Sequence, residues 1–275
     1  MEQSKKLSLA EYREIGTWLH RLRVSLIAAL IADVVCVLFL NLLVTLGVNM
    51  EMEFCINVAN WLDEDSTVYG LIVFIPNAIV LIYYTSILML HTYEKGLLAA
   101  GVFGIAGFLY RAAGSNVNSE SVSKVESSLS TMLSTSLLLL LLGVIFRKIY
   151  CDSMKKAAGE TFDDTRKKWD GLWKLTLVVA AVSAVLLVVF QIVLRTEMED
   201  FKRYSDSFDS FDLDSYYDLV TRIVNIVTIM ANIVTITEVI LFLFELKCVK
   251  STQEDVDVLI RAEEDSMRPD NSGLI

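Results

Sequence analysis

The sequence predicts an all-α fold, a bundle of helices that crosses a membrane several times. Hydrophobic residues make up 54% of the 275-residue chain, and the mean hydropathy is +0.52. These residues gather into several apolar runs of roughly 18 residues or more, which is the length that a helix needs to cross a bilayer. Only two prolines interrupt the chain. Soluble domains of this length do not contain several such runs, so we expect a polytopic membrane protein.

We expect six spans, which are the apolar stretches between clusters of charged residues. They lie at about 24–47, 69–91, 96–113, 128–146, 175–194 and 218–247, lengths that suit membrane crossings. Together they form one membrane domain, 24–247, arranged as three hairpins that each leave and return to the same side. The stretch 96–113 is short and rich in glycine. Its glycines are either close-packing points of a full span, which we favour, or the mark of a re-entrant segment.

Polar segments flank the spans and are expected to include two short amphipathic helices on the membrane surface. Ser8 and Glu11 form a capping box, and apolar side chains follow at helical spacing within residues 1–23. We therefore predict an amphipathic helix in this cytoplasmic N-terminal segment. The loop 195–217 has aromatic residues on one helical face, which favours a second helix of this kind.

The distribution of basic residues predicts which side of the membrane is cytoplasmic. With six spans, the N-terminal segment, the connection 92–96, the basic segment 147–174 and the acidic tail 248–275 fall on one side. Together with Lys247 at the end of the sixth span, this side holds 18 of the 24 Lys and Arg residues. Basic residues mark the cytoplasmic side. We therefore expect a protein of the cell (cytoplasmic) membrane with both termini in the cytoplasm, and one short helix in the tail. The tryptophans also fall at predicted span ends, as an aromatic belt requires: Trp18, Trp61, Trp169 and Trp173.

The last apolar run contains a line of polar side chains. Steps of three and four residues place them on one side of a helix. This polar stripe consists of Arg222, Asn225, Thr228, Asn232 and Thr235. A spanning helix tolerates such a stripe only where it faces protein or water. Two interpretations stay open, a polar path for a solute and a set of hydrogen bonds that hold helices together.

Asp33 and Glu238 are the candidate site residues, because a charged carboxyl inside a span is costly unless it faces the bundle. Both lie roughly 13–15 Å inside the predicted cytoplasmic boundary. Two costly groups at one depth are better placed facing each other, so we predict that the first and sixth helices are neighbours. The pair is either a proton or cation site or a neutral acid that donates an interhelical hydrogen bond. Glu245, near the end of the last run, is expected to reach solvent.

The sequence contains none of the motifs that mark common catalytic sites, such as G-x-S-x-G, H-E-x-x-H or a P-loop. The four cysteines have no paired spacing that would indicate a metal cage. Topology and anionic lipids account for the bases of 147–174. We therefore expect no enzyme activity, no catalytic residues, no metal, no cofactor and no nucleic-acid partner.

Two functional hypotheses follow for a multi-pass membrane protein of this kind. The first is a small carrier, or the membrane subunit of a transport system, with a polar path along the sixth helix. The alternative is a non-catalytic membrane scaffold or interaction protein whose polar stripe only packs helices. The expected partners are the lipid bilayer, a proton or cation, and a partner membrane subunit or a second copy of the chain.

Overall fold

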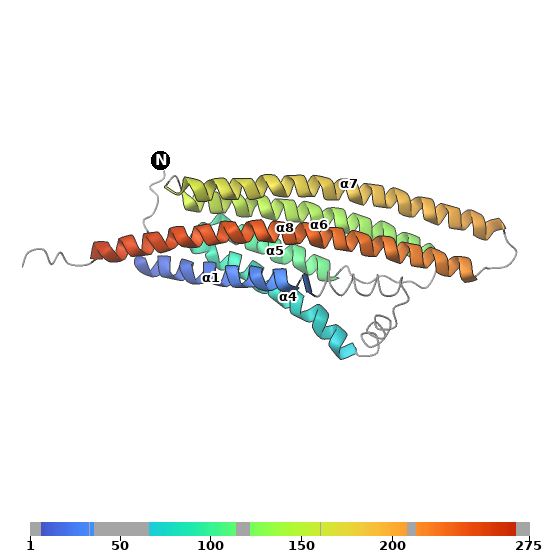
Figure 1. The fold of residues 1–275 in the computed structure, drawn as a ribbon, viewed down its shortest axis with the longest axis horizontal. Coiled ribbons are helices and arrows are strands. Elements are labelled where there is room, and N and C mark those ends of the chain that lie inside the picture. The colour runs from blue at the N-terminus through green and yellow to red at the C-terminus, as the bar shows by residue number, and fades with distance from the viewer. Residues whose placement is uncertain are drawn as a thin grey trace, which may run out of the picture.

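The computed structural model shows an all-helical chain (Figure 1). It describes residues 7–32, 34–35, 66–113, 122–159, 161–207 and 213–267, and no strand occurs among them. The helices are α1 (Leu9–Ala32), α4 (Ser66–Met89), α5 (Gly96–Ala113), α6 (Val122–Ala158), α7 (Asp163–Ser207) and α8 (Leu213–Met267), with a short 3-10 turn, η2 (Leu90–Thr92), after α4. The predicted all-α class is confirmed.

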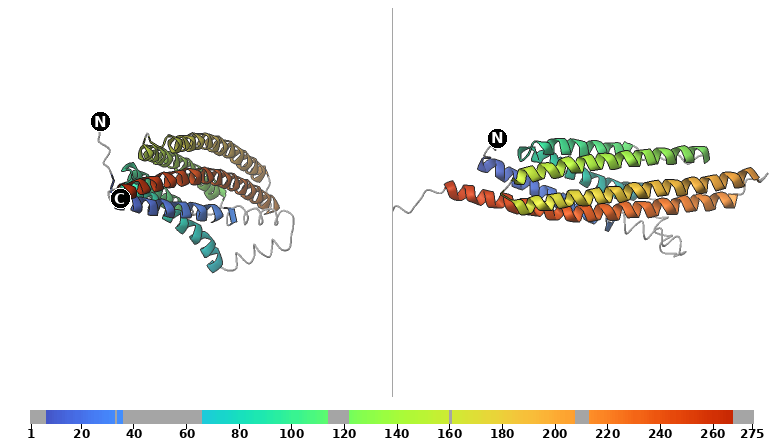
Figure 2. Two further views of the ribbon diagram at one scale, coloured as in Figure 1. Left: turned by 60° about the vertical axis from the view of Figure 1, so that its left-hand side comes forward. Right: turned by 90° about the horizontal axis from the view of Figure 1, so that it is seen from above.

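The helices pack side by side and form a ring that follows the order of the chain (Figures 1 and 2). α4 packs against α1 and α5, α6 packs against α5 and α7, and α8 packs against α7. α8 also packs against α1, which closes the ring. The predicted contact between the first and last helices is therefore confirmed, while Asp33 itself lies outside the described residues.

One end of the ring, which we call the packed end, has a dense core. It combines most of the length of α1 with the N-terminal parts of α5 and α7, the C-terminal parts of α4 and α6, and the C-terminal half of α8. Its fully buried side chains include Ile15, Leu19, Leu97, Tyr150, Met154 and Val256. Trp169 is also fully buried, and its Nε1–H donates to Thr252 Oγ1 at 3.0 Å. The prediction that Trp169 belongs to an interfacial aromatic belt is wrong, because the helices of the packed end enclose its side chain.

Away from the packed end, the helices expose large apolar side chains on their outer faces. Examples are Ile31 on α1, Ile82 on α4, Leu141 on α6, Val185 and Ile192 on α7, and Leu243 on α8. Such a surface suits lipid and is unfavourable in water. Within the described residues, three stretches are long and apolar enough to cross a membrane, Leu9–Ala32, Phe74–Thr92 and Asp163–Glu197. Gly96–Tyr110 is a shorter apolar helix, and the six-span arrangement stays a prediction.

The N-terminal segment does not form a separate helix on the membrane surface. The Ser8 N–H donates to Glu11 Oε2 at 2.7 Å and the Glu11 N–H donates to Ser8 Oγ at 3.3 Å, so the capping box is confirmed. It starts α1, which runs without a break into the first predicted span. The apolar face of residues 9–23 packs on protein rather than lipid, because α8 extends beside it and places Val256 next to Gly16.

The basic segment 147–174 is a helical hairpin rather than a loop. α6 continues to Ala158 and α7 begins at Asp163. Gly159 lies in the turn at φ +64°, a left-handed conformation that favours glycine at a helix C-terminus. Ion pairs one turn apart, such as Lys148–Asp152 at 2.9 Å, support the helices where their sequence is polar.

Two other segments that the sequence places outside the membrane also continue long helices. α8 runs to Met267, so most of 248–275 is part of α8 and not a tail with one short helix. α7 runs to Ser207, so the first part of 195–217 belongs to α7 and not to a separate surface helix. Hydropathy changes at these points while the helical conformation does not, because backbone hydrogen bonding is indifferent to the polarity of the side chains.

Two glycines let α5 approach α4 closely. A Cβ atom built at Gly101 would lie 2.5 Å from the Cβ of Leu88, and one at Gly104 would contact the ring of Tyr84. These two glycines are therefore close-packing points, as expected. A Cβ atom at Gly107 would have nothing within 4 Å.

Candidate functional site: a cavity inside the ring

A cavity of about 420 Å³ lies inside the ring, and α4, α5, α6, α7 and α8 all contribute to its wall. A volume of this size is enough for a small organic molecule. Most of the side chains that line it are apolar, and they include leucine and valine residues of α6 and α7. Tyr83 and Phe146 line the cavity and also belong to the core of the packed end, so the cavity adjoins that end directly.

Glu238 is the carboxyl side chain that lines this cavity. Thr237, Leu241 and Phe242 line it from the same helix, at the spacing that places side chains on one side of α8. The Glu238 side chain is half-buried, and it forms no ion pair within the described part of the chain. The structure thus places this candidate residue toward the inside of the ring, where water or a ligand can stabilise its charge.

The other candidate residues are placed only in part. Arg222 is exposed, and its Nη1 lies 3.5 Å from Glu197 Oε2 of α7, as expected for a residue near the end of a span. The rest of the polar stripe belongs to α8, but these side chains lie outside the described part of the structure: Asn225, Thr228, Asn232 and Thr235. A polar path along α8, and a pairing of Asp33 with Glu238, therefore stay predictions.

A buried ion pair bounds the cavity on the side of the packed end. Arg147 of α6 donates through Nη1 to Oε2 of Glu245 on α8, and the hydroxyl of Tyr83 on α4 donates to Glu245 Oε1 at 2.7 Å. Glu245 is fully buried and the side chain of Arg147 is 9% exposed. Each carboxylate oxygen has a donor, which is the condition under which a buried charge is tolerated. We call these three residues the buried triad.

Aromatic rings surround the buried triad. The guanidinium carbon of Arg147 lies 5.7 Å from the ring centre of Phe146 and 5.8 Å from that of Phe242, which are cation–π distances. Phe146 in turn stacks on Tyr150, with ring centres 5.6 Å apart. Since Tyr83, Phe146, Arg147 and Phe242 all line the cavity, the ion pair and the rings form its boundary with the packed end.

Sequence reasoning missed the buried triad. The expectation that Glu245 reaches solvent is wrong, because α6 and α4 cover it and supply the donors for both of its oxygens. A signal was present in the sequence. Arg147 directly follows the span 128–146, and Glu245 lies two positions before Lys247 at the end of another span. Asp33 and Glu238 were paired because they lie at the same predicted depth in the membrane. The same comparison would have paired the opposite charges of Arg147 and Glu245.

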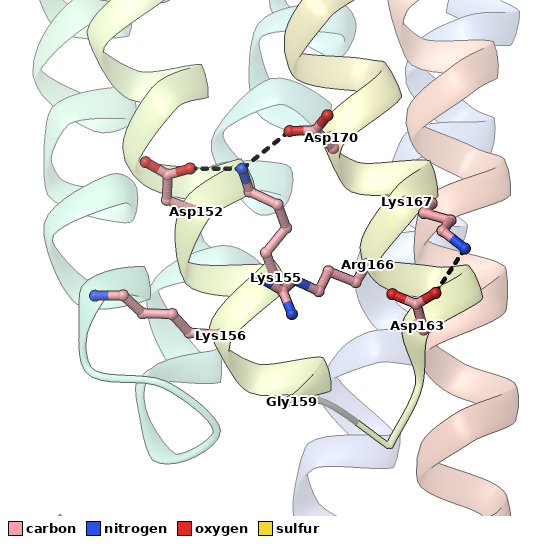
Figure 3. Close-up of a pocket in the computed structure, with 8 residues that line it drawn as sticks. All are labelled: Asp152, Lys155, Lys156, Gly159, Asp163, Arg166, Lys167 and Asp170. Carbon is pink, nitrogen blue, oxygen red and sulfur yellow. Dashed lines mark hydrogen bonds and ion pairs between the residues drawn. The ribbon is translucent and has the colours of Figure 1, made fainter. Parts of the chain in front are cut away.

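A second hollow, of about 610 Å³, lies on the outside of the α6–α7 hairpin (Figure 3). Lys155 Nζ lies 2.9 Å from Asp152 and 3.4 Å from Asp170, and Lys167 lies 2.6 Å from Asp163. Burial raises the pKa of the Asp152 carboxyl, but hydrogen bonds from its lysine partners outweigh this effect and hold the pKa below its usual range. Among its described lining residues, three carboxylates offset most of the charge of four basic side chains, and the Lys155–Asp170 pair links α6 to α7. We therefore interpret the hollow as a solvated ion-pair network.

Comparisons with protein-family models, with curated proteins and with solved structures found no match to this chain. The function is therefore inferred from the geometry of the cavity and of the buried triad.

Proposed function

We propose that this chain is an integral protein of the cytoplasmic membrane that carries a small solute, or the membrane subunit of a transport system, and that the cavity lies on the path. The observation that supports this function best is the cavity of about 420 Å³ with Glu238 in its wall. Helices that only hold one another together pack without large voids, since an empty cavity destabilises the fold. A ligand site accounts for both the cavity and the costly carboxyl.

In this proposal the packed end lies in the cytoplasm, and the six helices cross the membrane as three hairpins. It is supported by the excess of Lys and Arg on that side of the predicted spans. On α7, the first large exposed apolar side chain is Leu177, which lies about 21 Å along the helix from Asp163. The α6–α7 turn would then project into the cytoplasm, well clear of the lipid.

In this arrangement the cavity would be closed on the cytoplasmic side. The buried triad and the rings of Phe146 and Tyr150 separate the cavity from the cytoplasm. The polar stripe of α8 begins on the other side of Glu238, so it would lead from the cavity toward the outer surface. A carrier alternates between such a state and one that opens to the cytoplasm.

Water access to the cavity tests this function. Ser183 lines the cavity, whereas Val185 on the same helix is exposed on the outer face of α7. We would compare Ser183→Cys with Val185→Cys in a chain without native cysteines, using a small water-soluble methanethiosulfonate. The reagent needs a thiolate, which forms in water and not in lipid. We expect Ser183→Cys to react and Val185→Cys to stay unreactive.

Two other results would contradict the proposal. If neither cysteine reacts in the folded chain, the cavity is dry, and the scaffold hypothesis replaces the carrier. If Val185→Cys reacts as fast as Ser183→Cys, the outer face of α7 is in water and does not lie in a bilayer.

A further inference from the structure

We propose that the cavity binds a hydrophobic organic monocation, an ammonium with an apolar body. This inference depends on the proposed function of the same cavity, because it names the class of solute. It is based on the charged and aromatic residues of the described cavity wall and on the volume of the cavity.

The charges of the wall favour a single positive charge in the ligand. Among the described residues that line the cavity, Arg147 and Glu238 are the two of the Lys, Arg, Asp and Glu types. The charge of Arg147 is neutralised by Glu245, which lies behind it in the wall and not in the cavity. The carboxylate of Glu238 is therefore the charge that a ligand would meet. In a surrounding of low polarity, a matching cation stabilises this carboxylate, whereas a neutral ligand leaves it unpaired and an anion repels it.

The rest of the wall favours an organic cation over a metal ion. Six aromatic residues on four helices line the cavity: Tyr83, Tyr84, Phe103, Phe108, Phe146 and Phe242. Aromatic faces attract ammonium groups, and they also cover apolar surface. A hard metal ion requires a shell of about six oxygen ligands, whereas most of this wall is carbon. The volume of about 420 Å³ is in the range of sites for small organic ligands.

The test uses radiolabelled benzyltrimethylammonium, whose positive charge is permanent. Its binding to the purified full chain in detergent would be measured by equilibrium dialysis at neutral pH. We expect saturable binding that Glu238→Gln weakens at least tenfold. The matched control is Glu254→Gln, since Glu254 is on the same helix but exposed and paired with Lys250. Neopentylbenzene has the same shape without the charge and should not compete.

A second pair of variants tests the location of the binding site without changing Glu238. Ala180 lines the cavity, whereas the neighbouring Ala181 is exposed on the outer face of α7. Ala180→Phe fills part of the cavity and should abolish binding, while Ala181→Phe should bind like the wild type. This pair keeps the inference testable if Glu238→Gln does not fold.

Each remaining outcome has a defined consequence. Equal binding by the wild type and Glu238→Gln would overturn the role of the carboxyl, and saturable binding that survives Ala180→Phe would overturn the site. If no saturable binding occurs while Ser183→Cys reacts with the thiosulfonate, this inference fails and the proposed function stands. If Ser183→Cys is also unreactive in the folded chain, both fail.

Discussion

Removing one charge of the buried triad should strongly destabilise the protein. Glu245→Gln keeps the shape of the side chain but leaves the guanidinium of Arg147 buried without its partner. Glu245 is fully buried and Arg147 almost so, hence water cannot replace the lost carboxylate. Breaking a buried pair from one side costs about 3–5 kcal/mol, and we expect a loss of this size in the free energy of unfolding.

The double variant Arg147→Met/Glu245→Gln should recover much of that loss. It removes both charges, and the glutamine amide can still accept the hydrogen bond of the Tyr83 hydroxyl, which donates to Glu245 at 2.7 Å. Replacing both members of a buried pair is often neutral, so the effects of the single substitutions should be far from additive. Tyr83→Phe alone should cost about 1.5–3 kcal/mol, because it removes a hydrogen bond to a charged group.

The assay is reversible unfolding of the purified chain in mixed micelles, followed by the fluorescence of tryptophan, since Trp169 lies in the core of the packed end. The matched control is Arg13→Met, which removes an exposed ion pair with Glu264 (2.6 Å) and should cost at most about 1 kcal/mol. A similarly small effect of Glu245→Gln, or additive effects in the double variant, would refute the reasoning. Should Glu245→Gln fail to fold, the double variant is expected to restore folding.

Two further predictions concern packing and pH. Gly101→Ala places a Cβ atom 2.5 Å from that of Leu88 and should cost about 1–3 kcal/mol, whereas Gly107→Ala has open space and should be neutral or slightly stabilising, as thermal unfolding would show. Burial raises the pKa of the Asp255 carboxyl above its usual range, although Thr165 and Lys168 oppose the shift. Its contribution to stability is therefore full below the usual pKa range of an aspartate and is lost as the pH rises through the raised pKa. Asp255→Asn should remove this loss, so that the variant gains stability over the wild type between acidic and neutral pH.

A comparison of two proteins can contradict each of these predictions. Equal melting temperatures for Gly101→Ala and Gly107→Ala would mean that α4 and α5 are not in close contact at that point. A difference between Asp255→Asn and the wild type that does not change with pH would mean that the carboxyl titrates alike in the folded and unfolded chains.

Local signals predicted the helices and several of their contacts. The capping box at Ser8 and Glu11, the close-packing role of Gly101 and the contact between the first and last helices follow from short-range patterns and from the high cost of carboxyls in a membrane. The ends of the helices could not be found in this way. Hydropathy marks where a sequence stops being apolar, whereas α1 and α8 continue as helices beyond that point and pack on each other.

The cavity and the buried triad depend on residues that are far apart in the sequence. Glu245 is buried because Arg147, 98 positions away, and Tyr83, 162 positions away, supply its donors. Five helices together form the cavity, and no single helix shows in its sequence which of its faces will line it. Glu238 could be named as a candidate, but the surface that it faces is a property of the whole ring.

The proposed function requires α8 to cross the bilayer with its C-terminal part in the cytoplasm. The side of the membrane that each end of α8 reaches tests this requirement most directly. Cys151 and Cys248, the native cysteines in the described part of the chain, cannot report this. Both are buried, and burial raises the pKa of their thiols to about 12, so a failure to react with the reagent would not show on which side of the membrane they lie.

The measurement therefore uses a cysteine-free chain with a single Arg222→Cys or Val258→Cys substitution. Both positions are exposed, and they lie roughly 54 Å apart along α8. With a membrane-impermeant maleimide, we expect Arg222→Cys to be labelled in intact cells and Val258→Cys to be labelled only after lysis. Labelling of both in intact cells, or of neither, would show that α8 does not cross the membrane, and the reverse pattern would place the packed end outside.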